Sequence, residues 1–254
     1  MEFQRIFLDR TSSTNSLVHE AYKTGAVAVP LCIRAGYQDS GRGIGQNTWH
    51  STAGKNLLMS VGVKMGLIKA ENQFEITKIV SLSLLHTVRT HFPDDGFAIK
   101  WPNDLYWNQK KLAGILISNI VQSREIEYSV IGIGLNVNEM DFPASLPNPV
   151  SLVQIGGNEM SPALLMESFL ENFDRETQRF FADTKATADD YLANMLYFNQ
   201  PMMYQVEAEN VCGIIRGVSS FGHLRLDIDG RGEQQFDLKE LSFLHRPCLR
   251  QNEH

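Results

Sequence analysis

Hydrophobic and polar residues follow two different periods along the first 200 residues, and this pattern predicts helices interspersed with strands. Apolar residues spaced three or four apart predict a core helix over residues 74–92 and an amphipathic helical region over 162–198. A cap at Ser13 or Thr14 and a stop at Gly25 predict a shorter helix between them. Apolar runs predict five strands, the last two close enough to form a hairpin: residues 27–38, 56–63, 97–101, 112–120 and 128–138.

The pattern changes after Pro201, where short strands alternate with turn residues. Such spacing predicts a small antiparallel barrel or sandwich of about 45 residues. We therefore expect two domains, over residues 1–199 and 200–247, and the first is an α+β domain with a mixed sheet and flanking helices. The expected turns of the second domain are at Glu209–Asn210, Phe221–Gly222 and Asp229–Gly230.

Composition argues against a nucleic-acid-binding, a membrane-spanning or a secreted protein. The 254 residues carry a net charge of −6, which argues against a nucleic-acid binder, because such proteins neutralise phosphates with Lys and Arg. No apolar run approaches the roughly 20 residues of a membrane span, and the N-terminal residues lack the layout of a secretory signal. Three widely separated cysteines favour a reducing cytoplasm, with no disulfide and no zinc site.

The stretch SGRGIGQNTW, residues 40–49, places three glycines at alternate positions, with Arg42 between the first two. A dinucleotide-binding turn needs a following helix and an acidic residue about 20 positions on, but the residues that follow here predict a strand. A phosphate loop ends in Gly-Lys-Ser or Gly-Lys-Thr, whereas Gly54 begins Gly-Lys-Asn. Two interpretations stay open: a plain hairpin connection, or a loop whose arginine and N–H groups face a carboxylate or phosphate.

The segment KWPNDLYWNQKKLAGILIS, residues 100–118, places a Trp-Pro-Asn-Asp turn directly after an apolar strand. Lys110 and Lys111 then stand at the entrance to a strand with almost no other charge. Such a lysine is either a solvated strand end or, facing inward, a point charge that holds a carboxylate against a phosphate. Asp104 is either a turn cap or a group that orients such a lysine or a magnesium ion.

The segment VIGIGLNVN, residues 130–138, carries Gly132 and Gly134 inside an apolar strand. Glycine weakens a strand unless a ligand or another backbone must approach closely. Two glycines on one face leave a flat strip of backbone on which a ring-shaped ligand could lie. Asn136 ends the strip on the same face and could donate to a phosphate or a nucleotide.

Five motifs in this order resemble biotin protein ligases: STN at 13–15, GRG at 41–43 with a tryptophan six residues on, KWPNDL, KLAGIL and GIGLNVN. The resemblance covers roughly residues 10–140, and the β-rich tail is similar to the small SH3-like C-terminal domain of that family. It implies a class II synthetase-like biotin/lipoate ligase catalytic domain. It also implies the short form of the enzyme, because the STN motif at residue 13 leaves no space for a DNA-binding domain, so no DNA partner is expected.

The resemblance implies a biotin–[biotin carboxyl-carrier protein] ligase. Such enzymes join biotin to ATP, forming biotinyl-5′-AMP and pyrophosphate, and pass the biotinyl group to a lysine of a carboxyl-carrier domain. ATP and Mg²⁺, bound through the ATP phosphates, are the implied cofactors, and the implied location is the cytoplasm. No metal ligand of the protein itself is assigned. A homodimer formed by edge-strand pairing is left open.

The resemblance also assigns roles to residues of this sequence. Ser13, Thr14 and Gln38 would bind the ureido end of biotin, above a floor formed by Gly132 and Gly134. Trp49 would stack near adenine. The implied catalytic residues are Lys111, Arg42 and Asp104. The implied biotin-binding residues are Ser13, Thr14, Asn15, Gln38, Gly41, Arg42, Gly43, Lys111, Gly114, Gly132 and Gly134. The implied ATP-binding residues are Arg42, Ile44, Trp49, Asn103, Lys111 and Asn136.

One position departs from the family pattern, because members often carry arginine or another polar residue directly after GRG and this chain carries Ile44. Isoleucine cannot pair with the phosphate of the adenylate, so we expect either looser retention of the intermediate or compensation by another residue. Two alternative functions stay open. A lipoate or octanoate ligase shares the fold and the catalytic lysine but has no need for a polar pocket end, and an inactive module would bind biotin without reacting.

Overall fold

Seven strands form the main sheet of the computed structural model, which describes residues 1–27, 30–45, 47–65, 68–93 and 95–248. The strand order is β1-β2-β3-β7-β6-β5-β4. Only β1 and β2 run parallel among these neighbours, so the sheet is mixed, as predicted. The strands are β1 (Gln4–Thr11), β2 (Leu31–Gln38), β3 (Leu57–Val63), β4 (Phe97–Lys100), β5 (Asp104–Trp107), β6 (Lys110–Gln122) and β7 (Glu125–Leu135).

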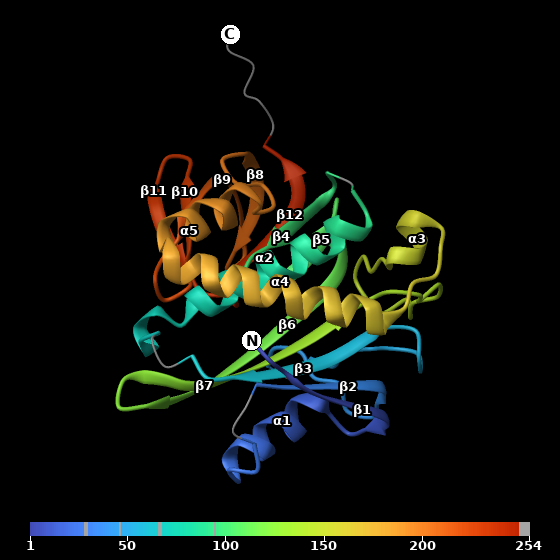
Figure 1. Cartoon of the computed structure of the whole chain (residues 1–254). Coiled ribbons are helices and arrows are strands. Elements are labelled where there is room, and N and C mark those ends of the chain that lie inside the picture. The colour runs from blue at the N-terminus through green and yellow to red at the C-terminus, as the bar shows by residue number, and fades with distance from the viewer. Residues whose placement is uncertain (28–29, 46, 66–67, 94, 249–254) are drawn as a thin grey trace.

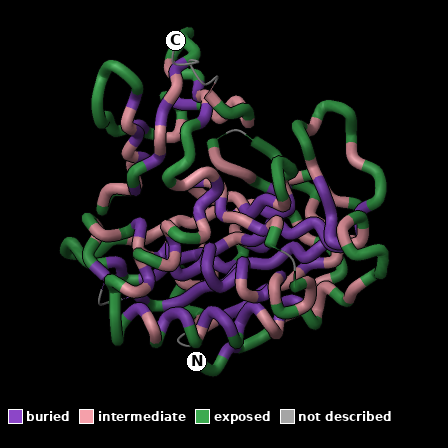
Figure 2. The backbone as a smooth tube through the Cα atoms, turned by 90° about the horizontal axis from the view of Figure 1, so that it is seen from above, coloured by how far each residue is buried: buried purple, intermediate pink, exposed green. Residues whose placement is uncertain are grey.

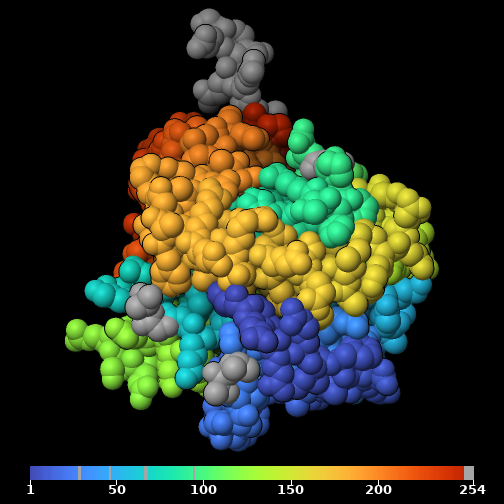
Figure 3. Space-filling view, viewed as in Figure 1, coloured from blue at the N-terminus to red at the C-terminus, as the bar shows by residue number. Residues whose placement is uncertain are grey.

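Helices cover both faces of this sheet (Figure 1). Helix α1 (Thr14–Lys23) packs on one face against β2, β3 and β7, while α2 (Phe74–His91) and α4 (Pro162–Ala182) cover the other. The other α-helices of the described residues are α3 (Leu152–Gly156) and α5 (Thr184–Ala193), and a short 3₁₀ helix spans Ala70–Asn72. The space-filling view shows α2 and α4 side by side as one layer above the N-terminal segment (Figure 3). The predicted helix at 74–92 is confirmed, and the helical region predicted at 162–198 is confirmed as two helices that end at Ala193.

Strand alternation divides the buried residues between the two faces. Ile131 and Ile133 of β7 point into the main core beneath α2 and α4, whereas Val130 belongs to a smaller cluster beneath α1. Buried segments accordingly run through the middle of the molecule, and exposed loops surround them (Figure 2). Because Gly132 and Gly134 alternate with these core residues, they face the α1 side and leave backbone bare there.

A second sheet follows residue 200, and all of its strands pair antiparallel in the order β11-β10-β9-β8-β12. Its apolar side chains join the main core, and Trp101 Nε1 donates to Gly222 O at 2.8 Å across the two sheets. The strands are β8 (Pro201–Val206), β9 (Glu209–Val218), β10 (Leu224–Ile228), β11 (Gly232–Phe236) and β12 (Leu241–Pro247).

Three expectations about these elements were wrong or incomplete. The turn expected at Glu209–Asn210 lies two residues earlier, at 207–208, because β9 already begins at Glu209. Strands β1 and β5 and helix α3 were not predicted. The 27–38 strand is confirmed from Leu31 onward, while residues 28–29 lie outside the described residues.

The absence of disulfides was also a wrong prediction, because Cys212 and Cys248 are bonded, with their Cα atoms 5.6 Å apart. Both cysteines flank β8: Cys212 pairs with Met203, and the N–H of Cys248 donates to the carbonyl of Pro201 at 3.2 Å. The two cysteines are 36 residues apart in the sequence, and they lie close together because β9 and β12 are the two neighbours of β8 in the sheet. The sequence alone does not give this strand order. None of the described helices is long and apolar enough to cross a membrane.

Candidate active site

A pocket opens on the α1 side of the main sheet, above the bare backbone of β6 and β7. We call it the glycine-floored pocket. It brings together most residues that the sequence assigned to the site: Ser13, Thr14, Asn15, Gln38, Arg42, Gly43, Ile44, Trp49, Asn103, Lys111, Gly114, Gly132 and Gly134. It also includes residues that sequence reasoning missed: Asn47, Thr48, Met59, Ser60, Ile115, Leu116 and Ile133.

One end of this pocket is polar and buried. Gln38 Oε1 accepts hydrogen bonds from Thr14 N at 2.7 Å and Thr14 Oγ1 at 3.0 Å, and Thr14 Oγ1 lies 2.8 Å from Ser60 Oγ. Asn15 Nδ2 is buried and has no hydrogen-bond partner among the described residues. Because buried polar groups are nearly always hydrogen-bonded, this end is suited to a ligand group that both donates and accepts hydrogen bonds.

The glycine strip is covered by the indole of Trp49. A Cβ atom at Gly134 would lie 2.7 Å from Trp49 Cδ2 and Nε1, and one at Gly114 would lie 3.0 Å from Trp49 Cζ3. A Cβ at Gly132 would lie 3.0 Å from Asn15 Nδ2. Side chains at these positions would therefore displace Trp49 or Asn15, which explains why the strand contains glycine there.

The SGRGIGQNTW stretch folds back on itself as a short hairpin at the pocket mouth. The N–H of Gly43 donates to Asn47 O at 2.8 Å, and the N–H of Trp49 donates to Gly41 O at 3.0 Å. Gly45 has φ +67°, a conformation that favours glycine. Arg42 is exposed and lines the pocket, whereas Gln46 lies outside the described residues. The hairpin and anion-loop interpretations are therefore compatible.

Gly41 is not among the residues that line the pocket, so its contact with a ligand stays a prediction. A Cβ there would lie 2.7 Å from the Trp49 carbonyl oxygen. Its small size therefore allows the two ends of the hairpin to approach each other.

Lys111 supplies a positive charge in the pocket. Its Nζ lies 2.7 Å from Asp104 Oδ1 and 5.9 Å from the centre of the Trp49 ring. Asp104 is absent from the residues that line the pocket, and its side chain is only 12% exposed. Its contact with the pocket is therefore through its ion pair with Lys111. Asn103 lines the pocket, but its Nδ2 donates to Ile115 O at 2.6 Å.

A second hollow adjoins the glycine-floored pocket and shares Trp49 and Lys111 with it. Asn136 lines this hollow, and its Nδ2 donates to Val150 O at 3.0 Å. Sequence reasoning missed most of the hollow, because its other wall is an irregular segment without periodicity. That wall contains Phe142, Ser145, Leu146, Pro147 and Pro149.

This arrangement suits a ligand with two parts that meet beside Lys111. One part would have a polar end group and lie beside Gly132, because Trp49 covers the strip at Gly134. The other part would occupy the second hollow. Two anionic groups meeting there would be neutralised by Lys111 and Arg42 in a partly buried site, where such charges act most strongly. Among the described residues, no group of three or more His, Cys, Asp or Glu could hold a metal ion.

Comparison with known proteins gives consistent similarities. Residues 7–136 match the model of the biotin/lipoate A/B protein ligase family. The chain is 27% identical over 225 residues to a biotin–[acetyl-CoA-carboxylase] ligase of Mycobacterium tuberculosis, covering 87% of this chain and 82% of that protein. It is 32% identical over 178 residues to a bifunctional ligase/repressor BirA of Bacillus spizizenii, covering 67% of this chain. The alignment covers only 52% of that relative.

The fold has a counterpart among solved structures. A biotin protein ligase from Aquifex aeolicus in complex with biotin and ATP superposes with a TM-score of 0.78 at 22% identity, covering 94% of this chain and 97% of that one. A biotin protein ligase from Leishmania major in complex with biotinyl-5-AMP superposes with a TM-score of 0.63. At such low identities the likeness establishes the fold, and it confirms the predicted mixed sheet with flanking helices.

Proposed function

The chain belongs to the biotin/lipoate A/B protein ligase family, and we propose that it is an ATP-dependent biotin protein ligase. It activates biotin to biotinyl-5′-AMP and transfers the biotinyl group to a lysine of a biotin carboxyl-carrier domain. The observation that carries this proposal is the position of Lys111. Paired with Asp104, it lies on the wall common to the glycine-floored pocket and the second hollow.

The polar end of the pocket favours biotin over lipoate. The ureido ring of biotin has two N–H donors and one carbonyl acceptor, and it fits beside Ser13, Thr14, Asn15 and Ser60. Lipoate would leave these groups without partners, and an unpaired buried polar group costs about 1–3 kcal/mol. A site built around hydrogen bonds discriminates strongly against an analogue that lacks them.

The chemistry follows from neutralising like charges. In the first step a carboxylate oxygen of biotin attacks the α-phosphorus of ATP, the bond to pyrophosphate breaks, and a mixed anhydride forms. Lys111 and Arg42 approach both anionic reactants and stabilise the charge that develops in the transition state. We expect Mg²⁺ to be held largely by the ATP phosphates, as is usual for this ion.

In the second step the amine of the acceptor lysine attacks the biotinyl carbonyl carbon. The nitrogen loses a proton, the C–O bond to phosphate breaks, and AMP leaves. The hairpin of residues 40–49 would cover the mixed anhydride, since this compound hydrolyses in open water. In this proposal Trp49 separates the two halves of the ligand, and Asn136 lies on the nucleotide side.

We also propose that residues 1–199 form the catalytic domain and residues 200–247 an SH3-like domain. The separate five-stranded sheet supports this division. Further parts of the proposal are a cytoplasmic location, no DNA partner and, as an arrangement to test by sedimentation, a homodimer. Because cytoplasmic thiols are usually kept reduced, the Cys212–Cys248 bond would be subject to reduction in that compartment.

Incubation with ATP, Mg²⁺, biotin and a biotin carboxyl-carrier domain tests the function. We expect intact-protein mass spectrometry to find one biotinyl group on the carrier, and none on a carrier whose acceptor lysine is replaced by arginine. Modification of a lipoyl domain by lipoate in the same assay would instead assign the chain to the lipoate ligases. Biotin binding without transfer or pyrophosphate release would identify an inactive binding module.

A further inference from the structure

Asp104 lies between two lysines, and only one of them faces the substrates. Lys111 lines the glycine-floored pocket and forms an ion pair with Asp104. Lys100, the last residue of β4, is the direct register partner of Asp104 across the β4–β5 hairpin. Residues opposite each other in an antiparallel pair point to the same side of the sheet. Lys100 is not among the residues that line either hollow.

Lys100 is enclosed by aromatic side chains from both sheets. Its Nζ lies 4.7 Å from the centre of the Phe243 ring and 5.6 Å from that of Tyr106. His245 stacks on Tyr106 with ring centres 5.8 Å apart, and its Nδ1 lies 3.0 Å from the hydroxyl of Tyr197. Phe243 and His245 belong to β12, so the C-terminal sheet completes the enclosure.

The Lys100 ammonium makes no hydrogen bond to another described residue and no ion pair within 4.0 Å. Burial lowers the pKa of Lys100, the charge of Asp104 acts in the opposite direction, and the charge of Lys111 adds to the lowering. Contact of a cation with an aromatic face contributes only about 1–2 kcal/mol. The nearby carboxylate of Asp104 is therefore the main favourable partner for this half-buried cation.

The proposed reaction explains why Asp104 has a second lysine beside it. Lys111 must turn toward the carboxylate and phosphate of the substrates, which weakens its ion pair with Asp104. Asp104 would then be a poorly solvated carboxylate without compensation, close to anionic reactants, and removing one partner of a buried pair is strongly unfavourable. A second cation opposite Asp104 offsets that loss.

We propose that Lys100 is a positioning residue that compensates the charge of Asp104 and thereby frees Lys111 to act on the substrates. The enclosure built by Phe243 and His245 holds Lys100 in place, which gives the C-terminal sheet a part in the first chemical step. This inference rests on the proposed function, because it requires Lys111 to stabilise the adenylate-forming reaction.

A double-mutant cycle of Lys100→Met and Asp104→Asn tests the inference. The readout is biotin-dependent exchange of labelled pyrophosphate into ATP, with the biotin Kd of each variant from calorimetry. We expect Lys100→Met to lower kcat about tenfold or more with little change in biotin Kd. Combined with Asp104→Asn, it should cause no further loss, because residues that act through a common partner are not additive. Lys110→Met, on the exposed start of β6, is the matched control.

Additive losses in the double variant would overturn the inference, since a purely structural lysine would weaken the protein with or without Asp104. Rescue gives a second test that does not depend on the Asp104 variant: Lys100→Arg keeps the charge and should retain most of the rate. A rate as low as that of Lys100→Met would also overturn the inference. Failure of the proposed function is distinct, because the wild type itself would then show no biotin-dependent exchange of pyrophosphate.

Discussion

At the scale of single residues, the site depends on glycines of the sheet, because a side chain at these positions would displace Trp49 or Asn15. Gly134→Ala adds a Cβ that would lie 2.7 Å from two atoms of Trp49, and the rigid indole would have to move. We expect the KM for biotin and ATP to rise about tenfold or more, because a 1 Å misplacement can cost a hundredfold in rate. Steady-state kinetics measures this effect.

Gly156→Ala is the control for that change, since its Cβ would lie 2.9 Å from Phe92 Cδ1, away from the site. This variant should lose stability and retain both KM values. Equal KM changes in the two variants would show that the Gly134 effect is a general packing defect.

Ile44 lines the glycine-floored pocket and brings no charge to it. Ile44→Arg should slow the release of biotinyl-AMP by about tenfold or more, because a hydrogen bond to a charged group contributes roughly 1.5–3 kcal/mol. Stopped-flow dilution of the preformed adenylate measures the release rate, with Ile44→Leu as the control of similar size. An unchanged rate in Ile44→Arg would show that this residue does not govern retention.

Sequence motifs predicted most of the residues that line the pocket, but they could not show which of these residues contact one another. Ser60 could have been found, because it lies on the same face of β3 as Gly62, while its neighbours Met59 and Val61 point into the main core. The packing of Gly41 against the Trp49 carbonyl is a contact that no local pattern reveals. The wall around Phe142 is irregular and has no periodic signal to read.

At the scale of elements, the Cys212–Cys248 bond ties the end of β12 to β9. In the chain-entropy model, closing a loop of 36 residues stabilises the fold by about 4 kcal/mol. Reduction should therefore lower Tm by on the order of 10 °C, as measured by scanning calorimetry with and without dithiothreitol.

The variant Cys212→Ser/Cys248→Ser should melt at the lower temperature under both conditions. Burial raises the pKa of the Cys32 thiol to about 12, so thiol labelling of the reduced folded protein should modify only the other two cysteines. A wild-type Tm that does not change after labelling has confirmed reduction would contradict this stabilising role.

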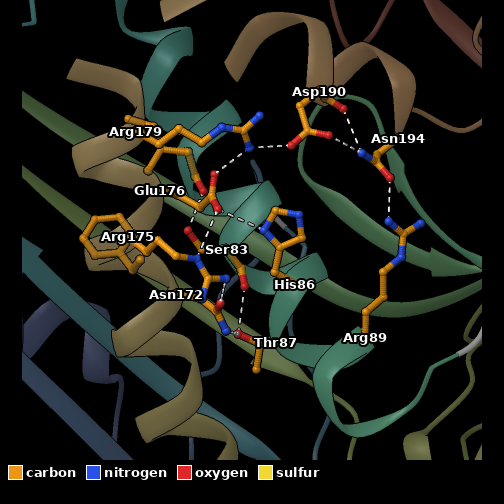
Figure 4. Close-up of polar contacts among 12 residues, drawn as sticks. Ser83, His86, Thr87, Arg89, Asn172, Arg175, Glu176, Arg179, Asp190 and Asn194 are labelled. Atoms are coloured by element: carbon orange, nitrogen blue, oxygen red, sulfur yellow. Dashed lines mark hydrogen bonds and ion pairs between the residues drawn. The ribbon is translucent and has the colours of Figure 1, made fainter. Parts of the chain in front are cut away.

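A polar network joins α2, α4 and α5 on the helical face, away from the active site (Figure 4). Glu176 of α4 is 2% exposed, accepts from Arg179 at 3.2 Å and lies 3.0 Å from His86 Nδ1. Burial acts to raise the Glu176 pKa, but the hydrogen bond and charge of His86 and the charge of Arg179 outweigh it and hold the pKa below the ordinary 4.5.

Because the pKa of Glu176 is lower in the folded protein than in the unfolded chain, ionised Glu176 stabilises the fold. This stabilisation is fully present at pH values above the pKa in the unfolded chain, and it is lost as the pH falls through the pKa in the folded protein. We expect the free energy of unfolding to fall on acidification below about pH 4.5, and to fall less in Glu176→Gln. Urea titrations from pH 3 to pH 7 would measure the difference, with the exposed Glu171→Gln as control. Parallel pH curves for wild type and Glu176→Gln would contradict the assignment.

At the scale of the whole molecule, periodicity predicted the long helices and the hairpin of β6 and β7 correctly. It missed β1, whose residues Gln4–Thr11 form an edge strand and show little burial contrast, and β5, which has only four residues. The proximity of Cys212 and Cys248 depends on strand order, and a single sequence gives no direct signal for contacts between strands distant in sequence.

The role proposed for Lys111 is to promote the adenylation of biotin, and release of pyrophosphate measures that step. Wild type and Lys111→Ala would each be supplied with ATP, Mg²⁺ and either biotin or lipoate. We expect release with biotin only, reduced about a hundredfold or more in the variant. Release that persists in Lys111→Ala, or that requires lipoate, would show that Lys111 does not have this role or that biotin is not the substrate.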